Sequence, residues 1–383
     1  MMMSKSAARL AIGGFRLTLL ALYRMFRHLP RHRRIVCLSR ESDTAPIDFE
    51  LVADYVVSHH PGYSVRILAR KLRNPVTYAA HMVRQLYYIA TSEAVLLDTY
   101  AIAVSLLAGH IDVPVVQMWH ALGNMKKFGY TAIGNGEGRD RTMASLMNMH
   151  KGYTSLLISS KSFITDYAAG FGVSPSIIHE APLPRTDLLL DRAYRTRRRE
   201  SIMRRFPQLQ GKRNIVYCPT FRKRTPVNQS QAMHALVDAI DFGRYNLIVK
   251  THPLDDLHFD DPRVIQDYPD SYDMLFAADY VISDYSTVIY EAGLLDLPVF
   301  LYGYDWKEYS SRRSLYIDPR RDIPTLFTAD AGEIMDAIAH DRFNRAAYRT
   351  FIRRNVAVPS HGSCTQRVVE HVFDLMNRSQ RSE

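Results

Sequence analysis

The side chains best suited to hold a phosphate group follow three short apolar runs in the second half of the chain. The runs 214–218, 246–250 and 280–282 each have the length of a buried strand. The polar residues at their ends are Thr220 and Arg222, then His252, and then Ser283, Ser286 and Thr287. Guanidinium and imidazole groups donate to phosphate oxygens, and the carboxyl ends of parallel strands meet at one edge of a sheet. We therefore expect one anion site there, although a histidine before proline more commonly stabilises a loop.

The segment 280–302 predicts a strand, a helix and a second strand. The helix runs from about 287 to 295, is closed by a proline, and is followed by the apolar run 299–302. In a parallel sheet the N-terminus of such a helix lies at the carboxyl end of the strand and attracts anions through its free N–H groups. The hydroxyls between 283 and 287 either line that anion site or only cap a structural helix.

One loop of the first half carries a candidate general base. The apolar run 113–119 is followed by His120, and Lys126 and Lys127 come a few residues later. A neutral imidazole there could take a proton from an attacking hydroxyl, which typically contributes about 10²–10⁴ in rate. The lysines suit a phosphate or an anionic acceptor. The alternative is that Trp119 and His120 pack the loop under the sheet.

Alternating strand and helix patterns surround these loops. From residue 34 onward, apolar runs of strand length alternate with helical patterns, which is typical of parallel, doubly wound sheets. The length of 383 residues suits an α/β fold of two Rossmann-like domains facing across a cleft, each of about 150 residues. The predicted divisions are 1–33 (a basic arm), 34–190 (the first domain), 191–212 (a basic linker helix, solvated or in contact with lipid) and 213–383 (the second domain).

The positive charge is concentrated at the start of the chain. Residues 1–40 hold nine Lys or Arg and no Asp or Glu, whereas the net charge of the whole chain is +10. On a helix through residues 5–31 the cations share one face and apolar residues the opposite one, the pattern of an amphipathic helix lying in an anionic membrane surface. Arginines interrupt the apolar run, so no membrane span is predicted. The alternatives are a secretory signal, a targeting arm or a helix packed on its own protein, and Gly13-Gly14 counts against a continuous helix.

The composition argues against several kinds of site and partner. Cys37, Cys218 and Cys364 lie far apart without ligand-like spacing, so neither a disulfide framework nor a zinc site is predicted, and a reducing compartment is the simpler interpretation. No His-x-Glu or paired-carboxylate spacing suggests a metal site, and no cofactor is expected. Nucleic-acid binding is disfavoured because the excess charge is confined to the arm.

Taken together, these motifs resemble the CDP-glycerol glycerophosphotransferase family, the teichoic acid primases and polymerases of bacterial envelopes. The similar motifs are Trp119-His120-Ala121 with Lys126-Lys127-Phe128-Gly129, Pro184-Arg185-Thr186-Asp187, Pro219-Thr220-Phe221-Arg222, His252-Pro253 and Ser283-Asp284-Tyr285-Ser286. The resemblance covers roughly residues 35–319. Two positions depart from it, because Pro182 and Ala121 stand where the family usually has glycine.

The resemblance implies a role for each motif. Family members adopt the two-domain GT-B fold, use a cytidine diphosphate donor, and lie peripherally on the cytoplasmic face of the membrane. The first domain then faces the acceptor and the second binds the CDP donor. By resemblance, His120 is the general base and His252 acts at the donor diphosphate. The residues expected to bind the donor are Thr220, Arg222, Ser283, Ser286 and Thr287, and those expected to contact the acceptor or a phosphate are Lys126, Lys127 and Arg185. Apart from the resemblance, Glu291 follows one helical turn later, and its carboxylate is expected to reach the ribose hydroxyls of the donor.

The expected activity is transfer of glycerol phosphate from CDP-glycerol to a hydroxyl of a lipid-linked or polymeric, membrane-associated acceptor, with release of CMP, in teichoic acid or related envelope-polymer synthesis. A CDP-ribitol ribitolphosphotransferase, a GT-B glycosyltransferase with a nucleotide-sugar donor, and a non-catalytic membrane scaffold are the alternatives. No additional domain for a growing polymer is visible, which favours a single addition. The sequence does not indicate the acceptor or the oligomeric state.

Overall fold

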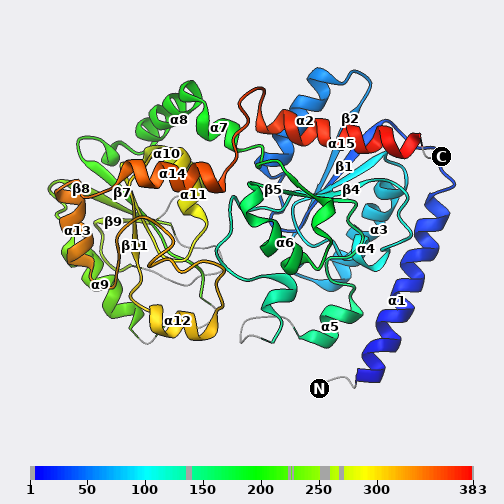
Figure 1. Ribbon diagram of the computed structural model, residues 1–383, viewed down its shortest axis with the longest axis horizontal. Coiled ribbons are helices and arrows are strands. Elements are labelled where there is room, and N and C mark those ends of the chain that lie inside the picture. Colours follow the sequence, from blue (N-terminus) through cyan, green and yellow to red (C-terminus); the bar gives the residue numbers. More distant parts are fainter. Residues whose placement is uncertain are drawn as a thin grey trace.

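The computed structural model describes residues 5–134, 140–222, 226, 228–250, 259–266 and 271–381. It contains two parallel sheets of six strands each, in two lobes that lie side by side with helices packed around each sheet (Figure 1). The predicted α/β fold with two Rossmann-like domains is confirmed.

The first sheet has the strand order β2-β1-β3-β4-β5-β6, with every neighbouring pair parallel. Its inner strands are almost entirely buried, as their continuous apolar runs require. The chain order reverses between β1 and β3, which is where open parallel sheets bind ligands. The strands are β1 (Arg34–Ser39), β2 (Ser64–Ala69), β3 (Ala94–Leu97), β4 (Val115–Gln117), β5 (Ser155–Ile158) and β6 (Ile178–Glu180), and the helices are α2 (Ile47–His59), α3 (Pro75–Ala90), α4 (Ile102–Leu106), α5 (Arg141–Leu146) and α6 (Ile164–Phe171).

The second sheet has the order β12-β11-β10-β7-β8-β9, which reverses between β7 and β10. The predicted unit of strand, helix and strand is confirmed as β10, α11 and β11. The strands are β7 (Arg213–Cys218), β8 (Tyr245–Val249), β9 (Val264–Ile265), β10 (Tyr280–Ser283), β11 (Val299–Tyr302) and β12 (Phe327–Thr328), and the helices are α9 (Gln229–Ala239), α10 (Ser271–Ala277), α11 (Val288–Leu294), α12 (Trp306–Arg312) and α13 (Ala331–Ala339).

Two helices lead from the first domain to the second. They are α7 (Thr186–Leu190) and α8 (Arg192–Arg205), so the predicted basic helix is confirmed as a helix. α8 packs on α10, and its arginines bind helix ends of the second domain. Arg195 donates to the carbonyl of Leu295, and Arg199 donates to the carbonyls of Ala277 and Ala278. Cations at helix C-termini are stabilising, so these contacts favour a structural role over contact with lipid.

The C-terminal helix returns to the first domain. α14 (Arg345–Asn355) packs on α11, whereas α15 (Cys364–Gln380) lies along α2 (Figure 1). The domain boundaries remain a prediction, but α15, within the range assigned to the second domain, packs on the first. An amphipathic pattern shows that a helix face is buried and does not show which domain covers it.

The side chain of Asp187 caps α15. Its carboxylate accepts hydrogen bonds from the N–H groups of Cys364 and Thr365, over 2.8 and 2.9 Å, and from Oγ1 of Thr365, over 2.6 Å. Replacing Asp187 by alanine is therefore expected to lower the stability of docked α15 by about 1–2 kcal/mol. Faster amide hydrogen exchange across α15, with Asp187→Asn intermediate, would support this. Unchanged exchange in Asp187→Ala would show that the cap does not hold the helix.

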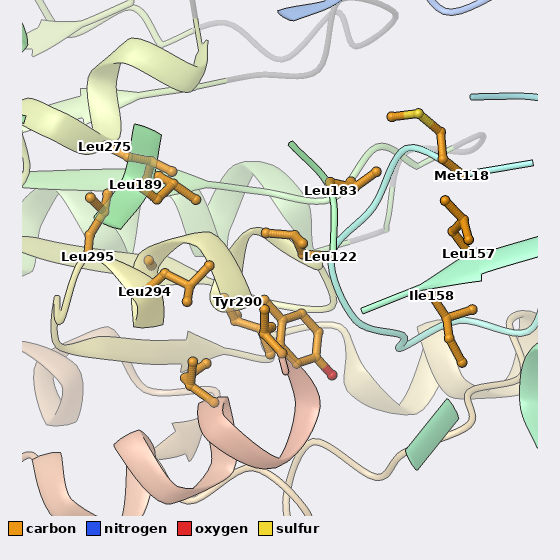
Figure 2. Packing of buried hydrophobic residues seen from close by; sticks show 14 of the residues in the cluster. Met118, Leu122, Leu157, Ile158, Leu183, Leu189, Leu275, Tyr290, Leu294 and Leu295 are labelled. Carbon is orange, nitrogen blue, oxygen red and sulfur yellow. The ribbon is translucent and has the colours of Figure 1, made fainter. Parts of the chain in front are cut away.

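One apolar cluster continues from one domain into the other. It includes Met118, Leu122 and Leu157 of the first domain and Leu275, Tyr290 and Leu294 of the second. Figure 2 shows Leu122, from the loop after β4, beside the ring of Tyr290 on α11. The next residue is Gly123 (φ +67°), where an added Cβ would lie only 2.4 Å from that ring. The loop that carries His120 is therefore packed directly on the second domain.

The basic arm forms one continuous helix, α1 (Lys5–Phe26), which Gly13 and Gly14 do not interrupt. The helix runs along the outer edge of the first domain (Figure 1) and contacts α3. Leu19 and Tyr23 are buried in that contact, and the hydroxyl of Tyr23 donates to Asp112 over 2.9 Å. Part of the predicted apolar face thus packs on the protein itself. None of the described helices combines the length and the apolar character needed to cross a bilayer.

Candidate active site

A sharp turn at the end of β4 presents His120. Trp119 adopts the left-handed backbone conformation (φ 61°), which is uncommon for a bulky residue and costs about 1–3 kcal/mol. Its N–H donates to Oε1 of Gln117 over 2.8 Å. Its ring centre lies 5.1 Å from that of Phe128 and 5.0 Å from that of Phe171. These contacts hold the strained turn in place, so that Trp119 packs the loop while His120 remains at a cavity wall.

The surroundings of His120 select one form of its ring. Nδ1 lies 3.0 Å from the backbone carbonyl oxygen of Asp98. A carbonyl can only accept a hydrogen bond, so Nδ1 carries the proton and the neutral ring keeps its lone pair on Nε2. This is the form that a general base requires.

A cavity of about 280 Å³ lies beside His120, where the first sheet reverses its strand order. Its walls include residues that follow β1, β3 and β4, together with Arg313 of the second domain. They combine the rings of Tyr100, Trp119 and Phe128 with the charged side chains of Arg40, Glu41 and Arg313. Such a lining suits a small polar ligand that also has apolar faces.

Arg185 connects His120 to the helices around it. Its backbone N–H and its Nε each donate to Asp48 over 2.8 Å, and its Nη2 donates to the carbonyl of His120 over 2.9 Å. Nη1 lies 4.0 Å from Oε1 of Glu291 on α11. These contacts give Arg185 a positioning role, and its contact with an acceptor or a phosphate remains a prediction.

A buried ion-pair cluster joins the ends of β7 and β10. Arg222 donates from Nη2 to Asp284 over 2.8 Å, from Nε to Asp305 over 2.5 Å, and from Nη1 to the carbonyl of Thr220 over 2.7 Å. Burial opposes the charge on Arg222, but the two carboxylates raise its pKa above the usual value. All three nitrogens donate to the protein and the side chain is only 5% exposed. In this arrangement the guanidinium organises the two loops, and its binding of the donor phosphates remains a prediction.

A profile of the CDP-glycerol:poly(glycerophosphate) glycerophosphotransferase family matches residues 21–374. The chain belongs to this family. The teichoic acid poly(ribitol-phosphate) polymerase of Bacillus spizizenii is 26% identical over 369 residues, which cover 91% of this chain and 58% of that protein. The teichoic acid ribitol-phosphate primase of the same organism is 25% identical over 363 residues, which cover 90% of this chain and 92% of the primase. The chain therefore spans little more than half of the first relative and nearly all of the second.

A solved structure has the same fold as this member of the glycerophosphotransferase family. A variant of the wall teichoic acid polymerase TagF superposes with a TM-score of 0.74 at 15% identity, covering 98% of this chain and 99% of the other. TagF has also been solved after a soak with CDPG. The likeness confirms the predicted GT-B type of fold.

The donor residues that the family resemblance indicated occupy different environments. Ser283 is completely buried, and its hydroxyl donates to the carbonyl of Cys218 over 2.9 Å, which connects β10 to β7. Its contact with the donor remains a prediction. Ser286 and Thr287 lie half-buried at the start of α11. Oγ of Ser286 accepts the N–H of Val288 over 3.4 Å, a weak cap. Donor binding by Ser286 and Thr287 remains a prediction.

The two lysines of the family's first-domain loop bridge the domains. Nζ of Lys126 donates to Oγ1 of Thr220 over 3.3 Å, which brings a cation to the end of β7. The backbone N–H of Lys127 donates to the carbonyl of Ser314 over 3.0 Å. Lys126 therefore lies close to the second domain, and the contacts of Lys126 and Lys127 with an acceptor or a phosphate remain predictions.

Glu291 is buried at the contact between the domains. Its Oε2 has no hydrogen-bond partner among the described residues. Burial raises the pKa of this carboxyl to about 7, against the opposing effect of Arg185. Its contact with the ribose hydroxyls of the donor remains a prediction.

The second predicted catalytic residue, His252, and the adjoining Pro253 lie outside the described residues. Within the part of the chain that the structure describes, no group of three or more His, Cys, Asp or Glu side chains is arranged to hold a metal ion.

Three residues of this family member's site were not found from the sequence. Arg40 lines the cavity, Asp98 supplies the carbonyl that orients His120, and Asp305 completes the ion-pair cluster. Arg40 directly follows β1 and Asp98 directly follows β3, both of which are apolar runs in the sequence, so the same argument that selected Arg222 applied to them. Asp305 shows no comparable signal, because only the fold brings it to Arg222.

Proposed function

We propose that this chain transfers glycerol phosphate from CDP-glycerol to a hydroxyl of a membrane-associated acceptor and releases CMP, in the synthesis of teichoic acid or a related envelope polymer. Family membership supports the donor class and the type of transfer. The observation that carries the proposal is the setting of His120. Its Nδ1–H donates to the carbonyl of Asp98, and its side chain lines a cavity between the domains. That arrangement provides a base beside a space of the size of one acceptor unit.

In the proposed reaction, the acceptor hydroxyl attacks the phosphorus that bears the glycerol. The proton passes to Nε2 of His120, a new phosphorus–oxygen bond forms, and the bond from that phosphorus to the bridging oxygen breaks. CMP leaves with the bridging oxygen and its electron pair. Such a transfer depends mainly on positioning and on charge near the phosphates. Two groups among the described residues could supply that charge. Lys126 lies near the end of β7, and the start of α11 follows the end of β10.

Ribitol phosphate is the second candidate for the transferred group, because both Bacillus relatives named above are ribitol-phosphate enzymes. The two activities are separated by incubating the purified protein with CDP-glycerol, CDP-ribitol and a panel of nucleotide sugars. A prenyl-diphosphate disaccharide with and without one terminal glycerol phosphate serves as the acceptor. CMP from one CDP-polyol supports the proposal and identifies the donor. A nucleoside diphosphate released from a sugar donor, with no CMP from either CDP-polyol, would overturn it.

The proposed location is peripheral, at the cytoplasmic face of the membrane, with α1 as the contact. Leu10, Leu17 and Met25 are 79%, 68% and 55% exposed and share one side of α1, with Arg9 and Arg24 also exposed. This side differs from the one that packs on α3. An exposed apolar stripe beside cations suits the boundary between head groups and acyl chains of an anionic bilayer.

Replacing both Leu10 and Leu17 by serine is expected to weaken vesicle binding by about tenfold or more, because each buried leucine contributes roughly 1.5–3 kcal/mol. Co-sedimentation with vesicles of phosphatidylcholine and phosphatidylglycerol measures the effect. Val76→Ser is the matched control, since Val76 is equally exposed on α3 but stands outside this stripe. Equal binding of the double variant and the wild type would exclude α1 as the membrane contact.

A further inference from the structure

A second cavity lies away from the candidate active site, where α8 packs on α10 of the second domain (Figure 1). We call it the α8 cavity. One wall is formed by arginines of α8, and the opposite wall by α10 and the turn 295–297 that follows α11. Its volume of about 530 Å³ lies within the range of sites for small molecules. It shares no lining residue with the cavity beside His120.

The arginines of the α8 cavity differ in how far they are neutralised. Arg192, Arg195 and Arg199 follow one another at the spacing of one helical turn, so they share a face of α8. Arg199 pairs with Asp279 over 2.9 Å. Arg195 donates from Nη2 to the carbonyl of Leu295 over 2.8 Å, and its other N–H groups have no acceptor among the described residues. Arg192 is exposed and forms no ion pair within the described part of the chain.

The carboxylate of Asp296 also lines the α8 cavity, but it is engaged on its far side. Nε and Nη2 of Arg349 on α14 donate to it over 2.8 and 2.5 Å. Burial lowers the pKa of Arg195, Asp296 opposes this effect, and the neighbouring Arg192 lowers the pKa further. Two cations held close together without a carboxylate of their own are unfavourable until an anion joins them. The α8 cavity is therefore suited to an anion that arrives with a ligand.

The opposite wall restricts what that ligand can be. Leu275 and Phe276 of α10 are only 2% and 5% exposed, and Leu297 is half-buried. A ligand that fits both walls has an anionic group at one end and an apolar or aromatic part at the other. Guanidinium groups bind phosphate oxygens bidentately. A phosphate monoester carries about −1.5 to −2 charges at pH 7, which matches the two available cations better than a carboxylate does.

We infer that the α8 cavity binds a phosphate monoester with an apolar or aromatic organic part, with Arg192 and Arg195 on the phosphate and the organic part against Phe276. A nucleoside monophosphate in solution and phosphatidic acid in a bilayer both offer this chemistry. The site is separate from the proposed transfer, because it uses neither His120 nor the donor loops. Since α8 leads from the first domain to the second, a bound ligand holds this helix against α10.

The test measures the binding of three probes to the full chain by isothermal titration calorimetry: inorganic phosphate, AMP, and short-chain phosphatidic acid below its critical micelle concentration. Both esters are expected to bind more tightly than phosphate, because they also cover the apolar wall. Replacing Arg192 and Arg195 together by glutamine is expected to raise the Kd of the esters by about ten- to a hundredfold, the cost of losing a charge-assisted hydrogen bond. Bound AMP should slow amide hydrogen exchange in α8 and in the turn 295–297.

Two further variants separate this site from general attraction to a basic helix. Replacing Arg197 and Arg205 together by glutamine is the matched control, because both are exposed on α8 and neither lines the cavity. This control removes the same charge and should keep the wild-type Kd. Thr196→Trp fills the cavity from α8 and retains every charge, so it is expected to weaken binding of both esters.

Vesicles of phosphatidylcholine with and without phosphatidic acid identify the source of the ester, in protein that carries the Leu10→Ser and Leu17→Ser changes. A loss of co-sedimentation on replacing Arg192 and Arg195 supports the inference with a lipid ligand. Unchanged co-sedimentation together with weakened AMP binding supports it with a soluble ligand.

Three results would overturn the inference, and none of them depends on CMP release. The first is that neither ester binds the wild type. The second is an equal Kd in the wild type and the variant without Arg192 and Arg195, or an equal loss in the variant without Arg197 and Arg205. The third is protection by AMP that is confined to segments outside α8, α10 and the turn 295–297.

Discussion

Replacing His120 by glutamine is expected to lower kcat for CMP release by about 10²–10⁴-fold, with KM for the donor changed by no more than about threefold. Glutamine can keep an N–H directed at the carbonyl of Asp98, the contact that holds Nδ1 over 3.0 Å in the wild type. It has no lone pair basic enough to take the proton of the acceptor hydroxyl. The variant therefore removes the base and retains the shape of the loop.

His234→Gln is the matched control for this variant. Its Nδ1 also lies close to a backbone carbonyl, that of Ser230 over 2.8 Å, but the side chain is exposed on α9. It should keep wild-type kcat. Near-normal turnover by folded His120→Gln would show that another group takes the proton and that the assignment of the base is wrong.

Replacing Arg222 by alanine is expected to destabilise the second domain by about 3–5 kcal/mol. The substitution leaves the carboxylates of Asp284 and Asp305 in a buried site without their cation, since both are almost inaccessible to solvent. Desolvated charges without a partner are strongly unfavourable. The loops after β7 and β10 would also lose the guanidinium that connects them, so donor binding should weaken in whatever fraction remains folded.

Urea unfolding followed by far-ultraviolet circular dichroism measures this effect. Arg263→Ala serves as the control, because Arg263 pairs with Asp261 at the surface of the same domain, and exposed pairs contribute little. The unfolding midpoint should fall clearly in Arg222→Ala and stay near the wild-type value in Arg263→Ala. If Arg222→Ala retained full stability but lost donor affinity, the originally predicted phosphate contact would be the better account of this residue.

His120 and Arg222 together show how much of the site the sequence could predict. The alternation of strand and helix patterns correctly placed both His120 and Arg222 at the ends of strands, because that depends on local hydrophobic period and turn residues. The pattern could not predict which groups these two side chains bind. An arginine at a strand end has the same appearance whether it binds a phosphate or a carboxylate, and Asp305 lies 83 residues away from Arg222 along the chain.

The arm and the C-terminal helix illustrate a second limit. The amphipathic pattern of α1 predicted a helix, but only the fold shows that Leu19 and Tyr23 are buried on α3 while Leu10 and Leu17 remain exposed. In the same way, the amphipathic sequence of α15 gives no indication that this helix crosses to α2. Periodicity reports that a face is buried, and tertiary packing decides what buries it.

The central claim is that the base at His120 serves phosphoryl transfer to an acceptor hydroxyl, and ³¹P NMR with mass spectrometry of the acceptor tests it most directly. With the preferred CDP-polyol, the acceptor should gain one polyol phosphate in a phosphodiester bond for each CMP released, and His120→Gln should form neither product at a comparable rate. Release of a nucleoside diphosphate together with a glycosidic product, or CMP formed without any phosphodiester on the acceptor, would contradict the account.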